Sequence, residues 1–483
     1  MRKAFCFAAI VILILSLVCT TALADDSFKP SHATPGQTTL ATIVTMVAAA
    51  LFIAAFVLLR RREKSRLFAE KDRLWPMLLA LCVLAVGLRV VVALTYEGYA
   101  TDIACFKGWS TAAFELGPSG FYTTDMFADY PPGYMYILYV LGWLRQVFAI
   151  EAGGAVFTLL VKLPSIIAEV VTAVIIYRIG KKQIGGMFGL MCAALILFNP
   201  AMFFNSSVWG QIDAVFILFM ALTLLYLKKE NFLLGALFFT FGLLIKPQAI
   251  MFAPVVGLAY VYALFKRGGM KKALVGIFGG AAVFAAVIAL GVWPFTGSQH
   301  PLWIIDKYAG TVNYYQYTSL NAFNLFALIG GNFADANQPF LFLDYTTWGW
   351  IFIGVVCAAV VILQWRSRER RPMFELGAFL ILSVFMLAHA MHERYILPVG
   401  VLLTFAYVFS RDKAALLFAA AFSLTGLAGQ MVTLYAEGVN VAPTPTTILS
   451  LINLALYIIY AAVTIKKLSS KKVLIKSPAM HDK

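Results

Sequence analysis

Long apolar stretches of helix length alternate with short polar segments along most of the chain. A membrane-spanning helix needs about 20 predominantly apolar residues, and thirteen candidate segments follow one another after residue 37. They lie near residues 38–60, 75–95, 154–178, 186–203, 212–228, 232–246, 248–265, 273–293, 349–364, 373–390, 394–410, 413–433 and 446–465. The pattern predicts an all-α polytopic membrane protein with about thirteen transmembrane helices after a signal peptide.

Residues 1–24 have the pattern of a secretory signal peptide. Arg2 and Lys3 precede an apolar run, and Ala22-Leu23-Ala24 forms a cleavage site of the small-x-small type. Cleavage would leave residues 25–37 as a short extracytoplasmic segment. The alternative is an uncleaved first membrane helix.

Lysines and arginines gather in alternate connections between the apolar segments. These clusters occur near residues 60–73, 178–182, 228–229, 266–272, 366–371 and 411–413, and again in 466–483. Because positively charged loops stay on the cytoplasmic side, we expect the mature N-terminus outside and 466–483 as a basic cytoplasmic tail. The predicted location is the cell (cytoplasmic) membrane.

The composition supports this class of protein. Of the 483 residues, 61% are hydrophobic and 13% are charged, whereas soluble domains carry about 25% charged residues. A soluble enzyme, a secreted disulfide scaffold and a nucleic-acid-binding domain are therefore excluded. The net charge of +15 fits attraction to anionic membrane lipids, not to nucleic acid.

Two outer connections of the predicted module 38–465 are long, namely 96–153 and 294–348. Segment 134–150 is apolar enough to resemble a span, but counting it as one would move Lys181 and Lys228 outside. We therefore place it on the membrane surface, together with a helix near 103–116. The loop 294–348 shows no clear element of its own, which is typical of a functional loop or lid.

The first outer loop holds two candidate site motifs. Asp102 follows the second helix and is either a helix N-cap or a general base at the mouth of a groove. Asp129 and Tyr130 precede two prolines that begin the next helix. Asp129 either caps that helix or, like Tyr130, points toward a bound sugar.

Two further motifs lie in later outer turns. Trp209, Gln211 and Asp213 combine an aromatic ring, an amide and a carboxylate, the mixture that commonly holds sugars. Lys246 and Gln248 interrupt an apolar hairpin. Lys246 is either a lysine that extends to the membrane interface or a cation that binds phosphate.

A fifth motif extends from His389 to Tyr395. His389 and His392 lie three residues apart, next to Glu393, which suggests a metal site, but this spacing of the histidines is not that of a zinc-binding helix and no third ligand follows. We assign no metal ligands and regard a divalent ion as the less favoured option. Arg394 is the best phosphate partner, because a guanidinium donates paired hydrogen bonds to phosphate oxygens. Glu393 either holds Arg394 in place or forms a simple ion pair.

All five motifs are expected on the same outer face. A base on one side and cations on the other suit group transfer from a lipid phosphate, because sugar nucleotides are not available outside the cytoplasmic membrane. Asp102 would take the proton of an acceptor hydroxyl that attacks C1 of the sugar. Lys246 and Arg394 would stabilise the leaving phosphate, so no cofactor is required beyond the lipid-linked sugar donor.

These residues resemble the GT-C superfamily of polyprenyl-phosphate-sugar glycosyltransferases, most closely bacterial mannosyltransferases related to the GPI-anchor mannosyltransferases. A weaker likeness is to dolichyl-phosphate-glucose glucosyltransferases. The motifs that carry the resemblance are Asp102, Tyr130-Pro131-Pro132, Asn199-Pro200, Trp209 to Asp213, Lys246 to Ala249 and His392 to Tyr395. The resemblance implies a GT-C-like helical bundle, Asp102 as the catalytic carboxylate, surface helices in the first outer loop, and mannose as the transferred hexose.

Other functions predict different patterns. A membrane transporter or lipid-linked glycan flippase should show inverted repeats and broken helices that meet near the membrane midplane, whereas here the polar motifs gather on one side. A non-catalytic membrane protein of polymer assembly is a further alternative. The acceptor is a glycan, a lipid or a protein, and none of the motifs selects among them.

Overall fold

The computed structural model of the chain describes residues 33–65, 74–124, 126–265, 269–314, 316–367, 371–436 and 440–470. The predicted signal peptide 1–24 lies outside these residues. So do most of segment 25–37 and most of the tail 466–483.

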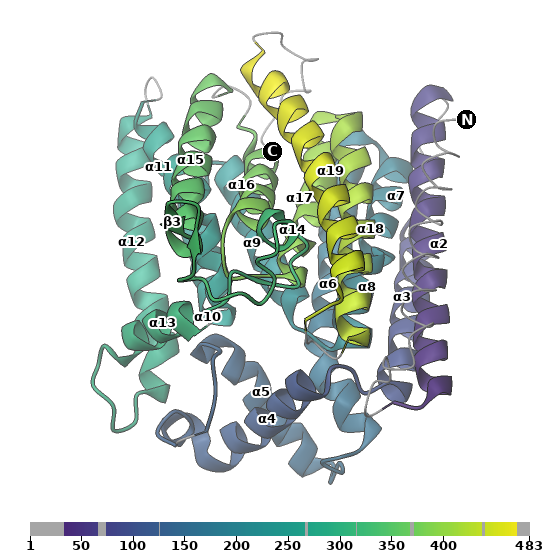
Figure 1. Ribbon diagram of the computed structural model, residues 1–483, viewed down its shortest axis with the longest axis vertical. Coiled ribbons are helices and arrows are strands. Elements are labelled where there is room, and N and C mark those ends of the chain that lie inside the picture. Colours follow the sequence, from purple (N-terminus) through teal and green to yellow (C-terminus); the bar gives the residue numbers. More distant parts are fainter. Residues whose placement is uncertain are drawn as a thin grey trace.

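Helices of very different length form a bundle (Figure 1). Its main members are α2 (Pro35–Ser65), α3 (Trp75–Thr95), α6 (Ala155–Ile184), α7 (Gly186–Leu197), α9 (Asp213–Lys228), α10 (Phe232–Ile245), α11 (Ala253–Leu264), α12 (Met270–Val292), α15 (Tyr345–Arg366), α16 (Met373–Leu387), α17 (Leu397–Ser410), α18 (Lys413–Tyr435) and α19 (Pro443–Ser469). Short helical pieces join them: α8 (Pro200–Phe203), the π-helix η1 (Phe204–Trp209), and the 3-10 helices η2 (Pro247–Phe252), η3 (Trp293–Phe295) and η5 (Glu393–Ile396).

Nine helices among the described residues are long and apolar enough to cross a membrane, and the bent pair Gly186–Leu197 with Pro200–Trp209 raises the number to ten. Each of the thirteen predicted segments contains a helix, but α9, α10 and α16 have only 16, 14 and 15 residues. The prediction of a helical, multi-pass membrane protein is therefore confirmed. A total of thirteen crossings stays a prediction.

Two helices run across one end of the bundle, α4 (Ala100–Phe121) and α5 (Pro132–Val147) (Figure 1). They occupy the segments expected to form surface helices. The two helices pack closely, since Ser110 donates a hydrogen bond to the carbonyl of Leu138. A Cβ at Gly142 would lie only 2.2 Å from the carbonyl oxygen of Ser110, so this contact requires glycine.

The loop 294–348 contains regular structure, contrary to the expectation that it has no element of its own. It holds α13 (Trp303–Tyr314), α14 (Leu325–Leu328) and the strands β1 (Ser319–Leu320), β2 (Pro339–Phe340) and β3 (Leu343–Asp344). Strand β1 pairs in parallel with β4 (Met391–His392), and β2 pairs with β3. The pattern missed these elements because they are short and depend on distant partners: the side chain of Asn324 caps α14 and also donates to the carbonyl of Phe385.

The short helices begin or end at candidate site residues. A helix of the length of α10 spans about 21 Å, less than the roughly 30 Å thickness of a bilayer core. Lys246 follows α10 directly, Asp213 begins α9, and the segment 388–395 follows α16. The polar motifs therefore lie where apolar helices stop early.

Candidate active site

A cavity of about 270 Å³ lies between α4 and the polar ends of the bundle helices. The predicted residues on its wall are Asp102, Asp129, Tyr130, Gln211, Lys246, Gln248 and Arg394. Two more wall residues, Pro247 and Tyr395, belong to the predicted motifs without having been predicted as site residues. Sequence reasoning missed the rest of the wall: Thr101, Cys105, Phe106, Trp109 and Phe127. One cavity thus collects residues from all five motifs.

Helix α4 contributes one face to this cavity. Asp102, Cys105, Phe106 and Trp109 recur at intervals of three or four residues, so they share a side of the helix. That spacing was visible in the sequence and could have identified the aromatic wall. The N-cap of α4 is Tyr99, not Asp102, and the capping interpretation of Asp102 is therefore wrong.

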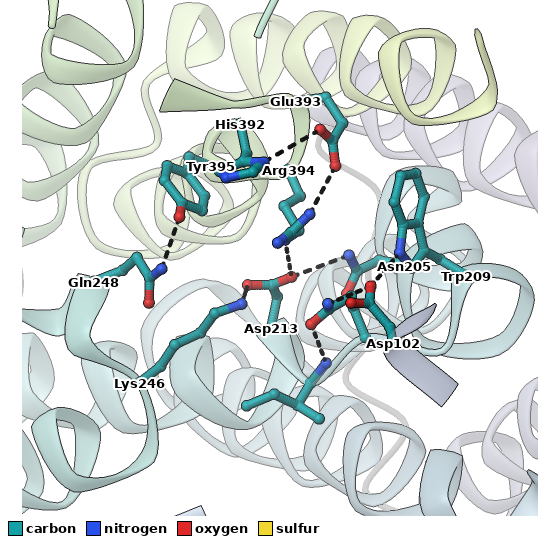
Figure 2. Close-up of polar contacts among 12 residues, drawn as sticks. Asp102, Asn205, Trp209, Asp213, Lys246, Gln248, His392, Glu393, Arg394 and Tyr395 are labelled. Carbon is teal, nitrogen blue, oxygen red and sulfur yellow. Dashed lines mark hydrogen bonds and ion pairs between the residues drawn. The ribbon is translucent and has the colours of Figure 1, made fainter. Parts of the chain in front are cut away.

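Two donors fix the carboxylate of Asp102 (Figure 2). The Nε1–H of Trp209 and the Nε2–H of Gln211 both donate to Oδ2, at 2.7 and 2.6 Å. The hydroxyl of Tyr130 donates in turn to Oε1 of Gln211 at 3.1 Å. These bonds leave Oδ1 as the carboxylate oxygen available to the cavity.

The segment that carries Trp209 and Gln211 is held by buried polar side chains of α6. Lys162 donates to the carbonyls of Tyr96 and Ser207, both at 2.8 Å. Ser165 donates to the carbonyl of Gln211 at 2.8 Å. The chain turns at Gly210 with φ of 94°, a left-handed conformation that favours glycine. A π-helix precedes this turn, a form that is common at functional sites.

The two cations of the cavity wall share one counter-ion, Asp213 (Figure 2). Its Oδ1 lies 2.5 Å from Nζ of Lys246, and its Oδ2 lies 3.9 Å from Nε of Arg394. Arg394 also donates to Glu393 at 3.1 Å. The Lys246 side chain is only 2% exposed, so it does not extend to a solvent-facing interface.

Four predicted residues lie behind the wall. Trp209, Asp213 and Glu393 contact wall residues without lining the cavity themselves, and His392 lies 4.0 Å from Glu393. His389 is more distant, because its ring packs against Trp350 with centroids 5.7 Å apart. Among the described residues, no three His, Cys, Asp or Glu side chains are placed to hold a metal ion.

Asp129 is the second carboxylate of the cavity wall. Burial raises its pKa above the usual 3.8, and the nearby charge of Asp102 raises it further, whereas Lys307 opposes the shift. Lys307 belongs to α13, where burial lowers its pKa, and it donates to the carbonyl of Ala128. Helix α13 thus braces the segment that carries Asp129. The N-cap of α5 is Pro131, so Asp129 does not cap that helix.

Strand pairing positions the motif around Arg394. His392 pairs with Leu320 in the parallel β1–β4 ladder, and η5 begins directly after it. Burial holds the pKa of His392 well below 6.5, and the positive charges of Arg394 and Lys246 add to the effect. The imidazole is therefore neutral at neutral pH.

A comparison with protein families identifies the class of this protein. The family model described as glycosyltransferase family 87 matches residues 127–389, which is more than half of the chain. The chain belongs to glycosyltransferase family 87. No curated protein matches the sequence. The matched range includes every predicted residue from Asp129 to His389, whereas Asp102 and Arg394 flank it.

Membership of family 87, a GT-C-like family of membrane glycosyltransferases, confirms the expected glycosyltransferase activity. It also agrees with the many apolar helices of the fold. A sugar donor, an acceptor and membrane lipids are accordingly the partners of this protein in general terms. The alternative of a transporter or flippase is not favoured by this result.

Proposed function

We propose that this family 87 enzyme transfers a hexose, with inversion, from a polyprenyl-phosphate donor to an acceptor hydroxyl. The supporting observation is that Asp102, Lys246 and Arg394 line the same cavity. A base and two cations on one wall match the two charge changes of such a transfer, loss of a proton from the acceptor and gain of negative charge on the phosphate.

In the proposed step, Oδ1 of Asp102 accepts the proton of the acceptor hydroxyl as its oxygen bonds to C1. The bond between C1 and the phosphate oxygen breaks, and its electron pair stays on the phosphate. Attack from the side opposite the leaving group inverts the anomeric carbon. Lys246 and Arg394 face the leaving phosphate and stabilise its charge.

The sugar would lie against the aromatic and amide residues of the wall. Oε1 of Gln248 is buried and has no hydrogen-bond partner among the described residues, while its Nε2 donates to the hydroxyl of Tyr395 at 2.7 Å. A buried acceptor without a donor is costly, and a sugar hydroxyl would satisfy it. Phe106 and Trp109 give this wall an aromatic, apolar part for the apolar side of the sugar.

The topology and the sugar belong to the same proposal. The basic clusters of the sequence support an extracytoplasmic position for the cavity end of the bundle, where a lipid-linked donor is the available form of activated sugar. Mannose is the hexose implied by the resemblance to GPI-related mannosyltransferases. The acceptor is a glycan, lipid or protein hydroxyl.

The test is transfer of labelled mannose by the purified protein in detergent, with polyprenyl-phosphate mannose and a mannose nucleotide supplied in separate reactions. We expect product only with the lipid-linked donor, and an anomeric configuration opposite to that of the donor. Transfer from the nucleotide alone would refute the lipid-linked donor. Retention of configuration would refute the direct displacement.

A further inference from the structure

The cation pair of the cavity is electrically balanced before any ligand binds. Lys246 and Arg394 carry two positive charges, and Asp213 and Glu393 carry two negative charges within ion-pair distance of them. The exposed fractions of the four side chains range from 2% to 13%. Solvent therefore screens these charges weakly, and each one affects the affinity of a bound phosphate.

Asp213 is distinct from the other members because it contacts both cations and does not line the cavity. Its Oδ2 also accepts a hydrogen bond from Asn205 at 3.1 Å, and Asn205 donates to Gln430 at 3.1 Å. These bonds hold the carboxylate behind the cations. A phosphate on the cavity side can approach Lys246 and Arg394 without displacing it.

The proposed reaction changes the charge of the phosphate while it remains at this site. The donor is a phosphodiester with one negative charge, whereas the product is a phosphomonoester with a second pKa near 6 and thus close to two negative charges at neutral pH. A cation pair without a counter-ion would bind the product much more tightly than the donor. Such tight product binding would slow turnover, because the product must leave the site in every cycle.

We infer that Asp213 is a fixed counter-ion that weakens binding of the product phosphate and so permits its release. This inference rests on the proposed function. It assigns Asp213 a role in setting the potential of the cation pair, in place of the sugar contact expected from its position in the sequence. Glu393 contributes less, because among the described residues it pairs with Arg394 and lies beside the neutral His392, whereas Asp213 contacts both cations.

The experiment measures binding of two micelle-soluble probes, farnesyl phosphate and its methyl diester, to the purified full chain above pH 7. We expect Asp213→Asn to lower the Kd of the monoester about tenfold or more, and that of the diester by clearly less, since the added potential acts on twice the charge. After its first catalytic cycle, Asp213→Asn should turn over more slowly than the wild type, because product release limits the rate. Added monoester should inhibit the variant more strongly than the wild type.

Glu230→Gln is the matched control, because Glu230 pairs with Lys272 and Arg371, outside the cavity wall, and its loss changes the net charge equally. Its two Kd values should stay at those of the wild type. Weaker or unchanged binding of the monoester by Asp213→Asn would overturn the inference, since a purely orienting carboxylate predicts weaker binding.

The wild-type protein supplies a second measurement that needs no folded variant. If Asp213 acts as the counter-ion, the Kd of the wild-type protein for the monoester lies within about tenfold of its Kd for the diester, despite the extra charge of the monoester. A monoester that binds a hundredfold more tightly would overturn it. If the wild type binds neither probe, the proposed polyprenyl-phosphate donor is itself refuted, whereas binding of both without an effect of Asp213→Asn refutes only the counter-ion.

Discussion

Asp102 and Arg394 line the same cavity, Asp102 from the first turn of α4 and Arg394 from the 3-10 helix that precedes α17. The proposed reaction requires this relationship, because a base and a phosphate-binding cation on different faces could not act on one substrate. The long separation of the two residues in the chain is closed by the packing of α4 across the bundle end (Figure 1). Each role can be tested by substitution.

Replacing Asp102 by Asn should abolish most turnover while leaving donor binding intact. Loss of a general base typically costs about 10²–10⁴-fold in rate. The measurement is kcat for transfer of labelled sugar, together with the Kd of farnesyl phosphate. Asp306→Asn, which removes an exposed carboxylate paired with His300, should leave both values unchanged. An Asp102→Asn enzyme with wild-type kcat would remove Asp102 from the mechanism.

Trp209→Phe should slow the reaction without changing substrate affinity much. The variant keeps a ring beside Tyr99, whose centroid lies 5.3 Å away, but loses the Nε1 donor to Asp102. A hydrogen bond to a charged group contributes about 1.5–3 kcal/mol, so we expect kcat to fall roughly tenfold to a hundredfold. Steady-state kinetics with both substrates varied would check this. A large rise in donor KM with unchanged kcat would indicate a binding role instead.

Arg394→Ala should weaken binding of the lipid-phosphate donor more than that of the acceptor. A lost electrostatic contact of this kind is typically worth about 2.7–4 kcal/mol at the transition state, and Arg394→Lys should recover only part of it because lysine lacks the paired donors. Arg411→Ala, at the opposite end of α17, is the control. Equal donor affinity in Arg394→Ala and the wild type would exclude Arg394 from the phosphate site.

The neutral, buried His392 predicts a loss of stability in acid. In the unfolded chain this histidine binds a proton below about pH 6.5, whereas in the folded chain its pKa is well below that value. Between the two pKa values the unfolded state holds more protons, so the free energy of unfolding rises with pH and falls on acidification. Thermal unfolding in detergent should show this dependence, reduced in His392→Gln.

The matched variant for that experiment is His300→Gln. The His300 side chain is 58% exposed and pairs with Asp306 at the surface. The His300→Gln variant should show the same pH dependence of thermal unfolding as the wild type. A His392→Gln protein with an unchanged slope below pH 6.5 would show that other groups cause the acid sensitivity.

The buried ion pair of Arg89 and Glu169 should matter for stability. Both side chains are 1% exposed, and Arg89 also stacks on Phe203 at 4.8 Å. Glu169→Gln leaves a buried charge unpaired, which typically costs roughly 3–5 kcal/mol. Replacing both residues by Met and Leu should recover most of that loss, as measured by thermal unfolding. If Glu169→Gln were as stable as the variant in which both residues are replaced, this account would be contradicted.

The order of apolar segments was sufficient to predict a helical membrane protein, because helix length and apolar composition are local properties that the bilayer requires. The same reasoning recovered the positions of α4 and α5. It failed for α13 and the β1–β4 pair, since two-residue strands such as Ser319–Leu320 exist only through partners far along the chain. Asp102, Lys246 and Arg394 were each predicted from the sequence as site residues, because an ionisable side chain at membrane depth is costly unless it has a partner or a function.

Only the tertiary structure decided which of these residues face the cavity and which support it. Asp213, Trp209 and Glu393 had the right chemistry for substrate contact, yet they lie behind Lys246, Asp102 and Arg394. His389 belongs to the same motif as Arg394 but packs on Trp350 instead. Sequence thus determined the residue types and the segments that carry them. The direction of each side chain depended on packing between distant helices, which no local pattern encodes.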